Sequence, residues 1–80
     1  MINVIIEKLN NEPYLFENAH ALSSSWIEVD GVGMSREVSH WLDYELGADV
    51  YPTFDDEEGY CYTAKINGIT INVTCFYEEG

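Results

Sequence analysis

Basic side chains are scarce in this 80-residue chain. Lys8, Arg36 and Lys65 stand against fifteen Asp and Glu residues, which gives a formal net charge of −12 at pH 7. Nucleic acids and anionic membranes repel so acidic a surface, so we expect direct binding to neither. Two explanations remain for the charge: a solvated surface that serves solubility alone, or a surface that meets a basic partner.

Cysteine and long apolar runs are scarce as well. Two cysteines are too few for a disulfide-based scaffold. No apolar stretch approaches the ~20 residues of a membrane-spanning helix. The N-terminal MINVIIEKLNN has no basic region and no cleavage-like site, so it does not read as a secretion signal. We expect a soluble, reduced, cytoplasmic protein that forms a single domain over residues 1–80.

Motifs for catalysis and for cofactors are also missing. No Gly-x-Ser-x-Gly turn marks a nucleophile, and no phosphate-binding loop is present. The acidic run FDDEEG does not fit a calcium-binding EF-hand. Aligning Gly59 with the sixth loop position puts Phe54 first and Lys65 twelfth, where Asp and Glu are required. The sequence therefore predicts a non-enzymatic protein with no catalytic residue, no cofactor and no metal site.

The C-terminal third contains a strong β-hairpin signal. Asn67-Gly68 stands between two runs of alternating apolar residues, and a two-residue turn there pairs Ile66 with Ile69. Side chains alternate with a period of two, so one face of this hairpin is apolar and the other mostly polar. Cys61 and Cys75 fall on opposite faces, which excludes a disulfide between them within one chain.

Two further elements are expected before the hairpin. Val50–Phe54 favours a strand, and Pro52, which cannot donate a ladder hydrogen bond, indicates an edge strand or the irregular end of one. Ser35–Gly47 favours a helix with Ser35 as its N-cap and Gly47 at its C-terminal end. The apolar residues of this helix recur at helical spacing: Val38, Trp41, Leu42 and Leu46.

The first third of the chain is ambiguous. Ile2, Val4 and Ile6 alternate as in a strand, although the apolar residues near the N-terminus also fit a helix. Their β-branched side chains favour the strand. A helix is expected over Tyr14–Leu22, and Trp26–Val29 reads as a helix continuation or as a strand. The predicted fold is α+β, an antiparallel sheet of three to four strands with one or two helices packed on one face.

The hairpin register gathers carboxylates at one end of the sheet. Glu58 falls opposite Tyr77, so the acidic run and the C-terminal glutamates are expected to meet there. The exposed side of the Ser35–Gly47 helix extends the acidic surface. The predicted partner-binding residues are Asp55, Asp56, Glu57, Glu58, Glu78, Glu79, Tyr77, Glu37, Asp43, Tyr44 and Glu45. Duplex DNA carries one negative charge per ~1.7 Å of axis, so such an array suits a basic groove that binds nucleic acid.

In size, acidity, lack of a catalytic motif and clusters such as FDDEEG, the chain resembles small acidic inhibitors that occupy nucleic-acid sites. These include DNA-mimic anti-restriction proteins, uracil-DNA glycosylase inhibitors and phage-encoded anti-CRISPR proteins. The resemblance implies an inhibitor of a host defence or DNA-processing complex. It matches no family motif, so no residue role is carried over from it. The alternatives are an acidic adaptor or immunity-type protein with another basic partner, and a solvated acidic domain without mimicry.

Overall fold

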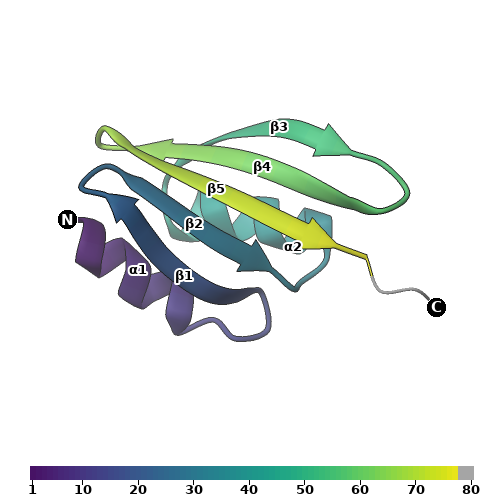
Figure 1. Ribbon diagram of the computed structural model, residues 1–80, viewed down its shortest axis with the longest axis horizontal. Helices are drawn as coiled ribbons and strands as arrows, with labels where there is room; N and C mark the ends of the chain where they lie inside the picture. Colours follow the sequence, from purple (N-terminus) through teal and green to yellow (C-terminus); the bar gives the residue numbers. More distant parts are fainter. Residues whose placement is uncertain (78–80) are drawn as a thin grey trace.

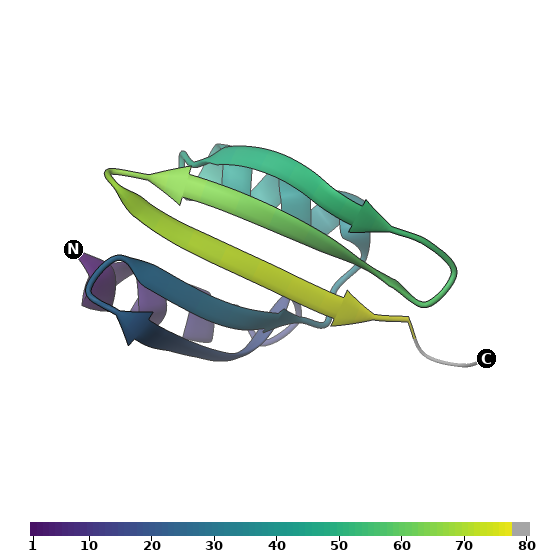
Figure 2. The same cartoon turned by 45° about the horizontal axis from the view of Figure 1, so that its top comes forward.

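The computed structural model describes residues 1–77, in which helices cover one face of a five-stranded sheet (Figure 1). The strand order is β1-β2-β5-β4-β3. Figure 2 shows the same arrangement from a second angle, with α1 behind β1 and α2 behind the other half of the sheet. The elements in chain order are α1 (Ile2–Asn10), β1 (Phe16–Ser23), β2 (Trp26–Gly31), α2 (Ser35–His40), the π-helical turn η1 (Trp41–Glu45), β3 (Asp49–Asp55), β4 (Gly59–Ile66) and β5 (Ile69–Phe76).

The α+β class is confirmed, but the sheet is larger than predicted and is mixed. It has five strands, and β2 runs parallel to β5, with Trp26 beside Thr70 and Asp30 beside Thr74. The other neighbouring strands are antiparallel. The parallel pair arises because the chain leaves β2 through α2, builds the far half of the sheet, and returns as β5 beside β2. This long-range pairing has no local sequence signal.

The C-terminal hairpin is confirmed in register and in turn chemistry. Ile66 pairs with Ile69, and further along the strands Tyr60 pairs with Cys75. Asn67 and Gly68 both have positive φ angles, 50° and 78°, as the two-residue turn requires. Cys75 is buried and Cys61, on the opposite face of the hairpin, is half-buried; both are free thiols. The predicted strand at residues 50–54 is confirmed as the edge strand β3.

The predicted helix at residues 35–47 is present, with two differences. Met34, not Ser35, occupies the N-cap position, and the Ser35 hydroxyl shares a hydrogen bond with the Tyr62 hydroxyl instead. From Trp41 the helix widens into η1, where the Leu46 N–H donates to the Trp41 carbonyl at 3.0 Å, a five-residue step. Gly47 follows with a φ of 74°, as expected of a glycine at a helix end.

Two expectations for the first third of the chain are wrong. Residues 2–10 form a helix rather than a strand, because Ile5 and Leu9, one turn apart, are buried against the sheet. The expected helix over Tyr14–Leu22 is absent: Tyr14 and Leu15 lie in a turn, and the rest belongs to the strand β1, which is joined to β2 by a turn at Ser24 and Ser25. Pairing with β2 overrides the helix propensity of this Ala- and Leu-containing segment. Trp26–Val29 belongs to the strand β2, which confirms one of the two alternatives predicted for this segment.

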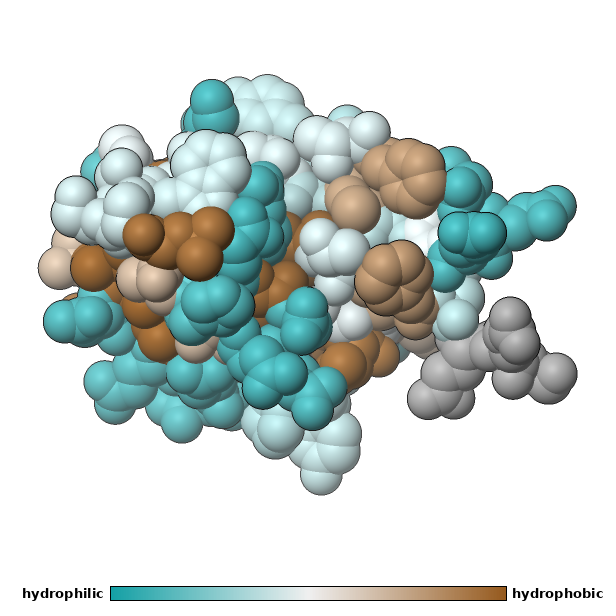
Figure 3. All heavy atoms as spheres, in the orientation of Figure 1, coloured by the Kyte–Doolittle hydropathy of each residue, from teal (hydrophilic) through white to brown (hydrophobic). Residues whose placement is uncertain are grey.

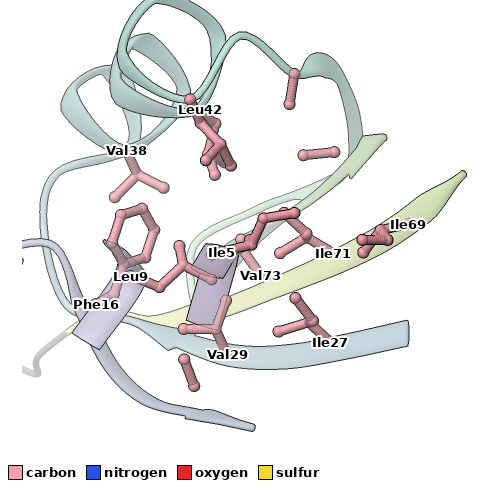
Figure 4. Close-up of a cluster of buried hydrophobic side chains, with 14 of the residues drawn as sticks. Ile5, Leu9, Phe16, Ile27, Val29, Val38, Leu42, Ile69, Ile71 and Val73 are labelled. Atoms are coloured by element: carbon pink, nitrogen blue, oxygen red, sulfur yellow. The ribbon is translucent and has the colours of Figure 1, made fainter. Parts of the chain in front are cut away.

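The core lies between the sheet and the two helices (Figure 4). Ile5 and Leu9 of α1, Val38 of α2 and Leu42 of η1 point toward the sheet, and each is at most 2% exposed. The side chains that meet them from β2 and β5 are Ile27, Val29, Ile71 and Val73. Each such side chain contributes about 1.5–3 kcal/mol on burial, so this layer dominates folding. Within residues 1–77, no helix is long and apolar enough to span a membrane.

Candidate partner-binding surface

The segment Asp55–Glu58, which comprises the last residue of β3 and the loop to β4, is called the acidic loop. All four of its side chains are exposed. The Asp56 carboxylate accepts hydrogen bonds from the backbone N–H groups of Glu58 (2.7 Å) and Gly59 (3.3 Å), and the Asp56 N–H donates to the Gly59 carbonyl (3.0 Å). Asp56 therefore fixes the turn with its own side chain. The carboxylates of Asp55, Glu57 and Glu58 therefore project from a backbone turn of fixed conformation.

Gly59 ends the acidic loop for a steric reason. A Cβ at this position would lie 2.0 Å from the Cys75 carbonyl oxygen, so only glycine allows β4 to approach β5 this closely. The close approach draws the base of the acidic loop against the end of β5.

Tyr77 joins the acidic loop, as the hairpin register predicted. Its backbone N–H donates to the Glu58 carbonyl at 2.7 Å, and its hydroxyl donates to the Asp55 carboxylate at 3.3 Å. Partial desolvation and the negative charge of Asp55 raise the pKa of the Tyr77 hydroxyl above its ordinary value. The predicted residues Glu78 and Glu79 lie outside the described residues.

Two tyrosines of β4 tie this end of the sheet to the connection between β2 and α2. Tyr60 is 1% exposed, and its hydroxyl donates to the Gly33 carbonyl at 2.7 Å. Burial is the main cause that raises the pKa of Tyr60. Tyr62, whose ring centroid lies 5.3 Å from that of Tyr60, meets Ser35 at the start of α2. These contacts join the end of β4 next to the acidic loop to the connection between β2 and α2.

The predicted residues of the helix are exposed but do not form one group. Glu37 and Glu45 line an open recess of about 500 Å³ toward the connection between α1 and β1. Asp43 and Tyr44 line a different groove, of about 570 Å³, beside Pro52 of β3. The acidic side chains of the helix therefore line two neighbouring hollows, which share Arg36 and His40, and neither hollow is lined by a residue of the acidic loop.

Exposed phenylalanines next to the acidic loop escaped the sequence prediction. Phe54 directly precedes the loop and is 50% exposed, and Phe76, the last residue of β5, is 75% exposed. Figure 3, which views the uncovered face of the sheet, shows hydrophobic side chains over β3 and β5 beside the hydrophilic β3–β4 loop. Period-two alternation could have predicted the exposure of Phe76, because Phe76 shares the outward face of β5 with Thr74 and Asn72.

A polar network on the uncovered sheet face was also missed. The Glu28 carboxylate accepts hydrogen bonds from the Trp26 indole N–H (2.7 Å) and the Asn72 side-chain Nδ2 (3.2 Å), and the Thr63 hydroxyl donates to the Asn72 side-chain Oδ1 at 3.0 Å. The polar face of the hairpin was predicted, but its extension onto β2 depends on the parallel pairing of β2 with β5. The polar side chains of this network are therefore hydrogen-bonded to one another across β2, β5 and β4.

Most of the negative charge has no cation to neutralise it. Three Lys and Arg side chains can pair with at most three of the fifteen carboxylates one to one. Within residues 1–77, no three His, Cys, Asp or Glu side chains are placed to hold a metal ion together. Exposed carboxylates of this kind can attract Lys and Arg side chains and accept hydrogen bonds from them.

The chain matches no protein-family model, no curated protein and no solved structure. Its function is therefore inferred from the geometry and charge of its own residues. Among these, the acidic loop with Tyr77 is the best-defined group.

Proposed function

We propose that this protein is a non-enzymatic inhibitor that binds a basic nucleic-acid-binding protein through an acidic surface that imitates the charge of DNA. The supporting observation is the acidic loop, four consecutive exposed carboxylates on a turn fixed by Asp56. A mobile acidic tail would lose conformational entropy on binding, whereas a loop ordered in advance loses less. The partner is a host defence or DNA-processing complex with a groove lined by Lys and Arg.

Charge and aromatic contact play different roles in this proposal. The uncompensated carboxylates speed the encounter with a basic groove and set the orientation of the complex. Exposed pairs contribute only about 0.2–1 kcal/mol each, so charge alone gives weak binding. Tyr77, Phe54 and Phe76 border the loop and supply the apolar area that excludes water from the contact.

The test is capture of the partner on the immobilised protein, followed by competition with duplex DNA. We expect the bound protein to be a nucleic-acid-binding one and DNA to displace it, because both ligands occupy the same groove. A partner that binds the protein and duplex DNA together would overturn the inhibitor function and favour an acidic adaptor.

A pair of matched variants locates the contact. Asp55→Asn, Glu57→Gln and Glu58→Gln together remove three charges from the acidic loop and leave Asp56, which holds the turn, in place. Glu7→Gln, Glu17→Gln and Asp49→Asn together remove three exposed charges elsewhere. The loop variant is expected to lose capture and the control to keep it. Equal capture by both would place the binding site outside the acidic loop.

A further inference from the structure

An open recess of about 500 Å³ lies beside α2 and η1, on the helix side of the sheet. We call it the α2 recess. Half-buried Leu15 and Trp41 form its apolar wall, and Glu37 and Glu45 stand one turn before and one turn after Trp41. Glu12 adds a third carboxylate from the connection between α1 and β1. An aromatic ring is thus bordered by three acidic side chains.

The walls of the α2 recess are held in place by the backbone and the core. The Glu12 carbonyl accepts the N–H groups of Leu15 (3.0 Å) and Phe16 (2.9 Å), and the Leu15 carbonyl accepts the N–H of Val32 (2.8 Å). The Trp41 ring meets the buried Phe16 ring edge-on, with centroids 5.0 Å apart. The recess therefore exists before any ligand arrives, which lowers the entropy cost of binding.

The charge and shape of the α2 recess select its occupant. Three carboxylates and the single guanidinium of Arg36 leave a net charge of −2 with His40 neutral, so a cation is favoured. The carboxylates do not converge as a metal site requires within residues 1–77. A cation with an apolar stem and a planar head matches this arrangement, because it can stack on an indole and reach separated carboxylates. Among side chains, that description fits arginine better than lysine.

We propose that the α2 recess binds an arginine side chain of a partner protein, with the guanidinium over Trp41 and between Glu37 and Glu45, and the stem against Leu15. That this partner is the same basic protein that the acidic loop binds rests on the proposed function. Arginine binding by the α2 recess does not depend on the proposed function, because no residue of the acidic loop lines the recess. It gives the protein a second contact, specific for one residue type, on a different surface.

The test is an amide and indole NMR titration of the intact protein with acetyl-Gly-Arg-Gly-amide. We expect the Trp41 indole N–H to shift together with amides of residues 12–15 and 36–45. Trp26, on the opposite face of the sheet and hydrogen-bonded to Glu28, serves as the internal reference and stays unchanged. A matching peptide with citrulline keeps the shape but lacks the charge, and we expect it to bind at least about fivefold more weakly.

Variants separate a specific recess from diffuse attraction. Glu37→Gln with Glu45→Gln is expected to weaken the arginine peptide roughly fivefold, and the matched Glu7→Gln with Glu17→Gln to leave its affinity within about twofold. Arg36→Gln removes the cation of the recess itself and is expected to tighten binding. Equal losses in the two double variants, equal shifts of both indoles, or equal binding of the citrulline peptide would each overturn the assignment. The acidic loop is unaltered in these variants, so failure here leaves the proposed function standing.

Discussion

Strand β4 is bounded by two turns of opposite character. At one end, Asn67-Gly68 joins β4 to β5 in two residues, with both φ angles positive and no acidic side chain. At the other end, the acidic loop joins β3 to β4 with four consecutive carboxylates and takes its shape from the Asp56 side chain. The first turn is set by backbone conformation, and the second by side-chain hydrogen bonds and the close approach at Gly59.

Under the proposed function, one turn of β4 serves folding and the other serves partner binding. The Asn67-Gly68 turn fixes which side chains of β4 and β5 face the core, so its energetic effect is on stability. The acidic loop adds like charges that repel one another, which does not stabilise the fold. Asp56 holds the turn through backbone N–H groups, and Asp55 accepts a hydrogen bond from Tyr77, so the loop can carry these charges without losing its shape. Changes at the two turns should therefore affect different measurements.

The largest expected effect concerns partner binding by the acidic loop. The triple variant Asp55→Asn, Glu57→Gln, Glu58→Gln should lower affinity for the captured partner by about 3- to 150-fold, since each exposed pair contributes ~0.2–1 kcal/mol. Its free energy of unfolding in urea should stay within about 0.5 kcal/mol or rise, because repulsion decreases. Calorimetric titration and urea unfolding give the two values. A variant that unfolds more easily but binds normally would reverse the assignment of roles.

The opposite turn should show the reverse pattern. Gly68→Val forces a β-branched residue to a φ of 78° and should lower the free energy of unfolding by about 1–2 kcal/mol, through backbone strain alone, since nothing lies within 4 Å of a Cβ there. Asn67→Gly is the control, because glycine accepts a positive φ, and should change stability by less than ~1 kcal/mol. Partner affinity of the folded Gly68→Val protein should be unchanged. A large loss of affinity would show that this turn contributes to recognition.

Tyr60 beneath the acidic loop predicts a pH dependence. Burial raises its pKa in the folded state, while the unfolded chain ionises near the ordinary value of 10. Stability is therefore present below pH ~10 and falls above it, by up to about 1.4 kcal/mol per pH unit, as the unfolded state releases its proton first. Tyr60→Phe should cost about 1 kcal/mol at pH 7, through the lost bond to Gly33, and should flatten the alkaline decline. An unchanged alkaline slope in this variant would exclude Tyr60 as its source.

The smallest expected effect concerns the side chain that shapes the acidic loop. Asp56→Ala removes the acceptor for two backbone N–H groups and should lower stability by about 0.5–1 kcal/mol. Asp56→Asn keeps an oxygen in place and should be nearly neutral. Urea unfolding and the amide chemical shifts of Glu58 and Gly59 report the two effects. If alanine and asparagine behave alike, the backbone rather than Asp56 holds this turn.

The sequence predicted what local chemistry determines. The Asn67-Gly68 hairpin, the edge strand with Pro52, and the meeting of Glu58 with Tyr77 all follow from turn residues and period-two alternation, and all are present. The predictions for the first third of the chain were wrong because its structure depends on pairing with strands that are distant in the sequence. Residues 16–23 become a strand only because β2 lies beside them, and β2 in turn is placed by β5, more than forty residues further along the chain.

The same limit applies to the candidate site. The exposure of Glu37, Asp43, Tyr44 and Glu45 was predictable from helical periodicity. Their division between two hollows was not, because it depends on the connection between α1 and β1 on one side and on β3 on the other. The role of Asp56 in shaping its own turn was likewise not predictable, because the sequence does not distinguish it from the other three carboxylates of the acidic loop.

The most direct test of an acidic contact surface is the salt dependence of partner affinity, measured for the wild-type protein and the triple acidic-loop variant between ~50 and ~200 mM salt. We expect wild-type affinity to fall steeply with salt, because exposed charges are screened, and the variant to show a clearly shallower slope. A flat wild-type profile, or equal slopes for the two proteins, would contradict recognition by the charges of the acidic loop.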